Sequence, residues 1–333
     1  MKKVFLGNSN LSISVLGVGG LHFGSFLDSR QAQEVIHGAL DLGINLIDTA
    51  PLYGGGLSEE YIGRAIRGRR EKVLLATKVG LKRVDSDGTF RVAVDALNET
   101  HIRKALEKSL RALGTDHMDL YQLHAFDHET PVEKTLQTLD RLMREGKIRF
   151  IGCSNFSGSE FQQSMEAAKK RQWPGFVSCQ THYNLLERRV EKELVPVCRS
   201  WGASVICNRA LGRGILTGKY AVGCPPPEDS RAYASERLRK CLSERTLRVA
   251  EALKVYAQER NHTATELAIA WLLSSGNADV VLAGVRNMNQ MAEWVRAMDW
   301  QLSDADKQAV DQILDKFSLT AEVHAMPQRF LET

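Results

Sequence analysis

Residues 45–60, which read NLIDTAPLYGGGLSEE, decide the fold of this chain. An apolar pair predicts a short strand that ends in the carboxylate of Asp48, and a proline and three glycines then predict a loop that holds Tyr53. We expect Ser58 to cap the helix that follows. An acid at a strand end with a phenol five residues later is typical of the mouth of an α/β barrel. Taken alone, a solvated turn capped by an aspartate would explain the same residues.

The same strand, loop and helix pattern recurs along the chain. Eight short apolar runs predict strands at 15–20, 46–48, 73–78, 118–123, 148–153, 176–179, 203–207 and 279–282. Helical spacing predicts helices that begin near residues 29, 59, 131, 159, 191, 244 and 287, and one that carries the apolar positions 102–113. Strands that alternate with helices predict parallel pairing, and eight of them without a glycine-rich nucleotide loop after the first favour a closed (β/α)8 TIM barrel.

The remaining segments decorate this barrel. A small β-hairpin is expected over 4–14, a polar loop over 79–95 and a long loop rich in glycine and proline over 208–243. An extra helix after Ser303 and a tail close the chain. No internal linker is evident, so residues 1–333 are expected to form a single domain.

Composition narrows the function classes. A hydrophobic fraction of 43% and a charged fraction of 25% are ordinary for a soluble globular protein. The formal net charge is only +4 and the basic residues are scattered, so no nucleic-acid partner is expected. The longest clear apolar run, 267–273, is too short for a membrane span, and the apolar residues after Lys3 are too few for a signal peptide. We therefore expect a cytoplasmic protein whose six cysteines are reduced core thiols.

Polar residues stand where the predicted strands end. They are Asp48 with Tyr53 just after it, Lys78, His124, Ser154, Asn155, Gln180, and Arg286 after Gly284. Parallel strands all end on one face of a barrel, so these side chains should converge on one mouth. Each alone could be structural, as a turn cap, a surface ion pair or a core histidine. Together, an acid, a phenol, an ammonium and an imidazole match proton transfer to a carbonyl oxygen.

The predicted chemistry follows from ordinary pKa values. A tyrosine titrates near 10, and a neighbouring Lys78 ammonium would lower the pKa of Tyr53. Asp48 would supply the counter-charge that a half-buried lysine needs, and His124 could donate a hydrogen bond to the substrate oxygen. No side chain can supply hydride, so a nicotinamide cofactor would have to do so.

Five spaced motifs carry a family resemblance. They are IDTA at 47–50 with LYG at 52–54, TK at 77–78, DLYQLH at 119–124, GCSNF at 152–156 and LGRGILTGK at 211–219. With these motifs in this order, the sequence resembles the aldo-keto reductase superfamily over nearly its whole length. The resemblance implies an NADP(H)-dependent oxidoreductase acting on a small carbonyl or sugar substrate, with Tyr53 as general acid and Asp48, Lys78 and His124 as the rest of a catalytic tetrad.

The resemblance also implies a cofactor site. Ser154, Asn155 and Gln180 would hold the nicotinamide carboxamide, and the loop of Leu211, Gly212, Arg213 and Gly214 would lie along the pyrophosphate. Arg286, Gln290 and Glu293 would serve the adenosine end, and Gly20 and Gly284 at two strand ends complete the set. Arg286 precedes a helix start without an acidic residue at 285–289, which suits a 2′-phosphate and favours NADP over NAD.

Two positions depart from the family pattern. Asn208 stands where the family usually stacks an aromatic residue on the nicotinamide, so we expect the guanidinium of Arg209 to take over this stacking, or the stacking to be weaker. Trp294 stands where the family often has an asparagine beside the adenine. Neither position belongs to the tetrad.

Other readings are weaker. GVGG at 17–20 lacks the third glycine of a dinucleotide fingerprint, and GILTGK at 214–219 is one residue short of a P-loop. His124 and His128 lie on a loop without the spacing of a metal motif, so no metal is expected. The functional alternatives are a cofactor-binding regulatory subunit with low turnover and a sugar dehydrogenase that works mainly in the oxidative direction. The sequence leaves the substrate and the oligomeric state open.

Overall fold

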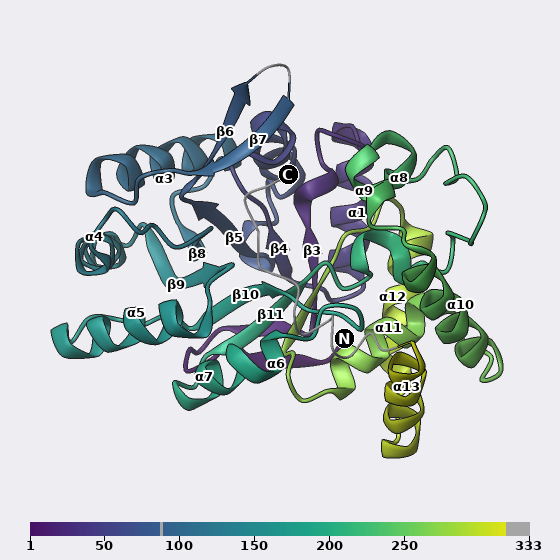
Figure 1. Cartoon of the computed structure of the whole chain (residues 1–333). Coiled ribbons are helices and arrows are strands. Elements are labelled where there is room, and N and C mark those ends of the chain that lie inside the picture. Colours follow the sequence, from purple (N-terminus) through teal and green to yellow (C-terminus); the bar gives the residue numbers. More distant parts are fainter. Residues whose placement is uncertain (87–88, 318–333) are drawn as a thin grey trace.

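A closed barrel of eight parallel strands forms the centre of the molecule in a computed structural model that describes residues 1–86 and 89–317 (Figure 1). Around the barrel the strands follow the order β10-β11-β12-β3-β4-β5-β8-β9. Their bounds are β3 (Leu16–Gly19), β4 (Leu46–Asp48), β5 (Leu74–Val79), β8 (Met118–Leu123), β9 (Ile148–Ser154), β10 (Ser178–His182), β11 (Ser204–Asn208) and β12 (Val280–Ala283). The predicted (β/α)8 fold is confirmed.

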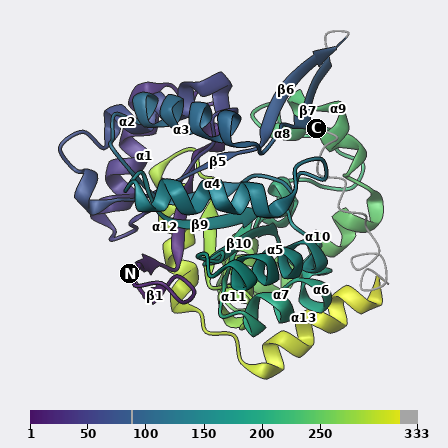
Figure 2. The ribbon, with the colours of Figure 1, turned by 90° about the vertical axis from the view of Figure 1, so that its left-hand side faces the viewer.

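Helices cover the outside of the barrel (Figures 1 and 2). They are α1 (Ser29–Asp41), α2 (Leu57–Ala65), α3 (Glu99–Leu113), α4 (Val132–Arg144), α5 (Gly158–Arg171), α6 (Val190–Glu193), α7 (Val195–Ser200), α10 (Glu244–Gln258), α11 (Ala264–Ser274), α12 (Met288–Arg296) and α13 (Asp304–Lys316). Side-chain caps begin several of them; Ser157 and Glu160, for example, form a capping box at the start of α5. Within the described ranges, no helix is long and apolar enough to cross a membrane.

Two layers of side chains fill the barrel interior, an apolar layer toward the amino ends of the strands and a polar layer toward their carboxyl ends. Successive side chains of a strand point to opposite faces, so Leu46, Ala76 and Leu120 face inward with Ile206, Val280 and Leu282. The hairpin of β1 (Lys3–Phe5) and β2 (Ser12–Ser14) closes this end with Leu6, Leu11 and Ile13. Two residues further along three strands, the inward positions hold Asp48, Lys78 and Gln122. The polar layer therefore lies toward the carboxyl ends of the strands.

The structure corrects the predicted polar loop at 79–95. Here β6 (Leu81–Ser86) and β7 (Thr89–Val94) pair as an antiparallel hairpin. Val92 and Val94 lie two residues apart on β7 and show the period of a strand, which the polar composition of the segment obscures. Figure 2 shows this hairpin at the end of the barrel opposite to the β1–β2 hairpin. The predicted loop at 208–243 likewise contains two short helices, α8 (Arg231–Ala234) and α9 (Glu236–Lys240).

Ser58 is not the predicted helix cap. Helix α2 begins at Leu57 after Gly56, and the buried Ser58 hydroxyl bonds Thr49 Oγ1 at 2.8 Å and the carbonyl of Gly20 at 2.9 Å. The hydroxyl thus ties the helix to two strand ends instead of capping it. Four of the six predicted core thiols, Cys153, Cys179, Cys198 and Cys207, are buried, whereas Cys224 is exposed and Cys241 is half-buried, so the prediction is wrong for these two.

Candidate active site

The four predicted tetrad residues come together at the mouth of the barrel. Lys78 Nζ, fully buried at the end of β5, donates to Asp48 Oδ1 at 2.5 Å, to the Thr49 carbonyl at 2.9 Å and to the Tyr53 hydroxyl at 3.5 Å. The Tyr53 and His124 rings meet edge to face with centroids 6.0 Å apart. Three neighbouring strands and the loop after β4 therefore place an acid, an ammonium, a phenol and an imidazole in one cluster.

Burial and charge set the protonation of this cluster. Burial raises the pKa of Tyr53; the Lys78 ammonium lowers it, as the sequence predicts, but by less than burial raises it. Burial lowers the pKa of Lys78, yet Asp48 and Tyr53 more than compensate and hold this pKa above its ordinary value. Burial, with Lys78 nearby, holds the pKa of His124 well below its ordinary value. The cluster thus carries a protonated phenol, an ammonium ion and a neutral imidazole near neutrality.

Two amide side chains bond the other oxygen of the aspartate, and a third amide bonds one of them. Gln122 Nε2 and Gln180 Nε2 donate to Asp48 Oδ2 at 2.8 and 2.9 Å. Asn208 Nδ2 donates to Gln180 Oε1 at 3.1 Å, so Asn208 belongs to this amide chain. Polar residues at strand ends do not point to Gln122, which lies one residue before the end of β8. The signal that could have found it is the inward parity that Leu120 and Gln122 share with His124, just after the strand.

Buried polar atoms beside the amide chain lack partners within the described part of the chain. They are Ser154 Oγ, Asn155 Oδ1 and Asn208 Oδ1. Asn155 is held in the left-handed region, at φ 61°, by bonds from its amide to the Gln180 carbonyl at 2.9 Å and from its side chain to the His124 carbonyl at 2.8 Å. A hydroxyl and two acceptor oxygens complement the carbonyl and the amino group of a carboxamide, so these residues fit the nicotinamide.

Basic side chains gather at a second part of the mouth, where the predicted phosphate ligands lie. Burial lowers the pKa of Arg231, and Arg213 and Arg286 lower it further. Burial, Arg231 and Arg286 lower the pKa of His22 to about 4. Arg213 lies in the turn Gly212–Thr217, where its φ of 59° and the positive φ values of Gly212 and Gly214 fold the chain back on itself. Cations that disfavour one another's charge are suited to a bound polyanion.

The residues predicted to serve the adenosine end form hydrogen bonds to other groups of the protein. Arg286 donates to the Asp229 carbonyl at 2.7 Å, and its guanidinium lies 4.6 Å from the centre of the Phe26 ring. Gln290 Oε1 accepts the Arg286 backbone N–H at 2.8 Å, while Glu293 accepts a hydrogen bond from Thr263 at 2.6 Å. Glu293 is thereby engaged with the start of α11.

Three further predicted cofactor positions lie at turns or strand ends. Arg209 has a φ of 53°, and burial, with Arg213 nearby, lowers its pKa to about 9. A Cβ at Gly20 would come within 2.7 Å of Ser58 Oγ, so this glycine permits close packing. Gly284 follows β12 and is exposed.

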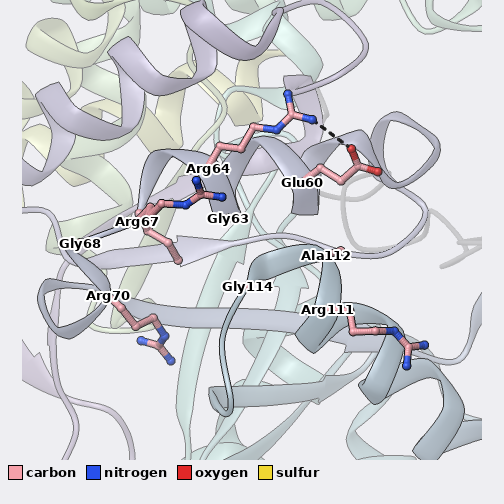
Figure 3. Close-up of a pocket in the computed structure, with 10 residues that line it drawn as sticks. Glu60, Gly63, Arg64, Arg67, Gly68, Arg70, Arg111, Ala112 and Gly114 are labelled. Carbon is pink, nitrogen blue, oxygen red and sulfur yellow. Dashed lines mark ion pairs between the residues drawn. The ribbon is translucent and has the colours of Figure 1, made fainter.

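A separate crevice lies away from the mouth, at the carboxyl ends of α2 and α3 (Figure 3). It has a volume of about 600 Å³ and is lined by Glu60, Gly63, Arg64, Ile66, Arg67, Gly68, Arg70, Arg111, Ala112 and Gly114. Figure 3 shows Arg64 turned toward Glu60, at 3.5 Å, and the guanidinium groups do not converge on one point. Arg64 and Arg111 lie in the last turns of α2 and α3, where they compensate the helix dipoles, and Arg70 pairs with Asp119 at 2.8 Å, so these three arginines have structural roles without a ligand.

The comparisons with known proteins agree with the fold. The aldo/keto reductase family model matches residues 15–315, and the chain belongs to this family. It is 34% identical to the uncharacterized oxidoreductase YrpG of Bacillus subtilis, covering 95% of this chain and 96% of the relative. It is 33% identical to a probable voltage-gated potassium channel subunit beta of Oryza sativa, covering 88% and 90%.

A solved structure provides a further match. The chain is similar to the glycerol dehydrogenase AKR11B4 from Gluconobacter oxydans, with a TM-score of 0.82, 32% identity and coverage of 95% and 96%. The protein is therefore an oxidoreductase of a family that generally uses NAD(P)H and small carbonyl substrates.

Proposed function

We propose that the protein reduces aldehydes or ketones with NADPH and that Tyr53 gives the proton to the carbonyl oxygen. The observation that carries this proposal is the Tyr53 hydroxyl 3.5 Å from Lys78 Nζ, whose charge Asp48 balances, with the His124 ring beside the phenol. This is the arrangement of a general acid with a stabilised conjugate base.

Each residue then has a role in reduction. Bound nicotinamide would supply the hydride, which no side chain can do. The raised pKa of Tyr53 keeps the phenol protonated near neutrality, so it can donate to the carbonyl oxygen. Neutral His124 can donate a hydrogen bond to the same oxygen, and the Lys78 ammonium stabilises the phenolate that remains.

The proposed cofactor contacts follow the two parts of the mouth. Ser154, Asn155 and Asn208 would hold the carboxamide with the atoms that lack protein partners. The loop from Leu211 to Gly214 would follow the pyrophosphate, and Arg286 would bind the 2′-phosphate that distinguishes NADP from NAD.

The direct test is NADPH oxidation by purified protein with a panel of aldehydes and ketones. We expect turnover by the wild type and its near-complete loss in Tyr53→Phe, with NADPH affinity nearly unchanged, because only the proton donor is removed. Tyr61→Phe, on α2, is the matched control and should retain activity. Substantial kcat in Tyr53→Phe would exclude Tyr53 as the acid.

Two other functions are favoured by specific relatives. The similarity to a potassium channel subunit beta favours a cofactor-binding regulatory subunit, which would bind NADPH with low turnover of carbonyls. The similarity to a glycerol dehydrogenase favours oxidation of an alcohol or sugar, which needs Tyr53 as phenolate. Since the pKa of Tyr53 is raised, the oxidation rate should climb toward alkaline pH, and comparing NADP⁺ with NADPH assays separates the directions.

A further inference from the structure

We propose that Gln122 is a positioning residue that holds Asp48 in the orientation required by Lys78 and Tyr53; this inference rests on the proposed function. Gln122 lies on β8 directly beside Lys78 of β5, since the two residues are register partners. Its side chain is fully buried, and its amide nitrogen donates to Asp48 Oδ2 at 2.8 Å. It contacts none of the groups that would react.

The charge of the aspartate fixes the direction of the hydrogen bonds. A carboxylate only accepts, so the amide groups of Gln122 and Gln180 must present nitrogen to Asp48 Oδ2. Gln180 Nε2 also donates to Gln122 Oε1 at 3.3 Å, which closes a ring of three side chains. Both N–H groups of Gln180 are then used within the protein. Gln180 can accept a hydrogen bond from a carboxamide but cannot donate one, which narrows the role that the family resemblance implies for it.

This ring determines how Asp48 meets the lysine. Two amide donors occupy Oδ2, so Lys78 Nζ bonds Oδ1 alone and keeps its remaining direction toward the Tyr53 hydroxyl. Without Gln122, the carboxylate could rotate and bring both oxygens to the ammonium, drawing it from the phenol. The pKa of Tyr53 would then rise further, because the ammonium that favours the phenolate would be more distant.

Packing alone does not explain a glutamine at this position. Two residues earlier on the same face of β8, Leu120 fills the apolar layer. A buried amide is costly unless its polar atoms are paired, whereas an apolar residue would fill the space without that requirement. Both polar atoms of Gln122 are paired, and both bonds lie within the ring around Asp48.

The experiment compares Gln122→Met, which removes the donor, with Gln122→Glu, whose neutral acid form can still donate. The charged groups that face position 122 are Asp48 of β4 and Lys78 of β5, while β9 places Gly152 beside it. We expect Gln122→Met to lower kcat roughly ten- to hundred-fold and to leave the NADPH affinity unchanged. In the pH–rate profile of carbonyl reduction, the alkaline limb should shift to higher pH. In Gln122→Glu, activity should recover as the pH falls and the new acid becomes neutral. Leu120→Met is the matched control and should behave as the wild type.

A spectroscopic titration makes the test independent of turnover. The absorbance of tyrosinate, followed with pH in cofactor-free protein and corrected with Tyr53→Phe, reports the pKa of Tyr53 directly. We expect it to be higher in Gln122→Met than in the wild type. An unchanged Tyr53 pKa in Gln122→Met would overturn the inference, as would a loss of NADPH affinity that accounts for the whole loss of activity. A wild type without any carbonyl turnover would instead count against the proposed function, and the titration would still decide the role of Gln122.

Discussion

At the scale of single residues, the mouth divides into a part that holds an acid, an ammonium, a phenol and an imidazole, and a part that is rich in cations. Asp48, Lys78, Tyr53 and His124 form the first, with every charge balanced or suppressed by burial. The second contains cations that lower one another's pKa, as Arg213 and Arg286 do at Arg231. The first part suits a neutral carbonyl and the second a polyanion.

Arg286 provides the residue-scale prediction. Its guanidinium is half-buried against Phe26 at the start of α12, where free helix N–H groups add to its positive charge. We expect Arg286→Ala to weaken NADPH binding roughly ten- to hundred-fold and to leave NADH binding almost unchanged, because a charged hydrogen-bond partner of the 2′-phosphate is lost. Fluorescence quenching gives both dissociation constants.

Arg296→Ala, at the opposite end of the same helix, is the control. This arginine pairs with Glu266 and should affect neither cofactor. Equal losses for NADPH and NADH in Arg286→Ala would mean that the arginine does not read the phosphate.

At the scale of elements, α2 joins the mouth to the outside of the barrel through a buried acid. Glu59, only 1% exposed, accepts a hydrogen bond from Thr77 Oγ1 on β5 at 2.7 Å. Thr77 points outward between two residues of the inward layers, Ala76 and Lys78. The strand that carries Lys78 is therefore held from outside the barrel by this helix.

The pH dependence of stability should report on Glu59. Burial raises the pKa of Glu59 above its ordinary 4.5, despite the hydrogen bond from Thr77. The folded chain then holds a proton that the unfolded chain releases, so this contribution is complete below pH 4.5 and is lost as the pH rises through the folded pKa. The slope for one proton is at most about 1.4 kcal/mol per pH unit.

We therefore expect Glu59→Gln to be more stable than the wild type at neutral pH, with the difference shrinking on acidification. Urea unfolding over a pH series measures it. Glu60→Gln, one residue along on the exposed side of α2, is the control and should show no such trend. If the difference in unfolding free energy between Glu59→Gln and the wild type did not vary with pH, it would contradict a raised pKa of Glu59.

At the scale of the whole molecule, the two ends of the barrel have separate tasks. The β1–β2 hairpin forms an apolar plug of Leu6, Leu11 and Ile13 at the amino ends of the barrel strands, and the polar layer lies at the other end. Catalytic residues at the carboxyl ends of barrel strands and stability at the opposite end follow the general organisation of this fold. The plug should therefore affect stability and leave the chemistry intact.

Ile13 tests this division. It is 1% exposed in the plug, and we expect Ile13→Ala to lower the free energy of unfolding by about 2–5 kcal/mol through lost burial and a residual cavity. The kcat of the folded variant should stay at the wild-type value. Phe5→Ala, in the same hairpin but 67% exposed, should change little. A loss of kcat without a loss of stability would place the plug in communication with the mouth.

The alternation within single strands made much of the fold and the mouth predictable. Leu46 and Asp48, or Ala76 and Lys78, are two residues apart, and a strand places such pairs on one face whatever its neighbours are. The number of strands and their parallel direction followed from the repeated strand–helix units. The hairpin at β6–β7 was missed because its many polar and charged residues obscure the two-residue period of its strands.

The sequence by itself determined which residues face the inside of the barrel and which strand ends carry polar groups, because both depend on the local two-residue period. Only the tertiary structure decided which inward residues meet. Gln122 and Gln180 lie 58 positions apart and reach the same oxygen of Asp48 because the strands are staggered and closed into a barrel. The tertiary structure also decided the pKa of Tyr53, because burial depends on the packing of the whole mouth. Burial raises this pKa by more than the nearby lysine lowers it.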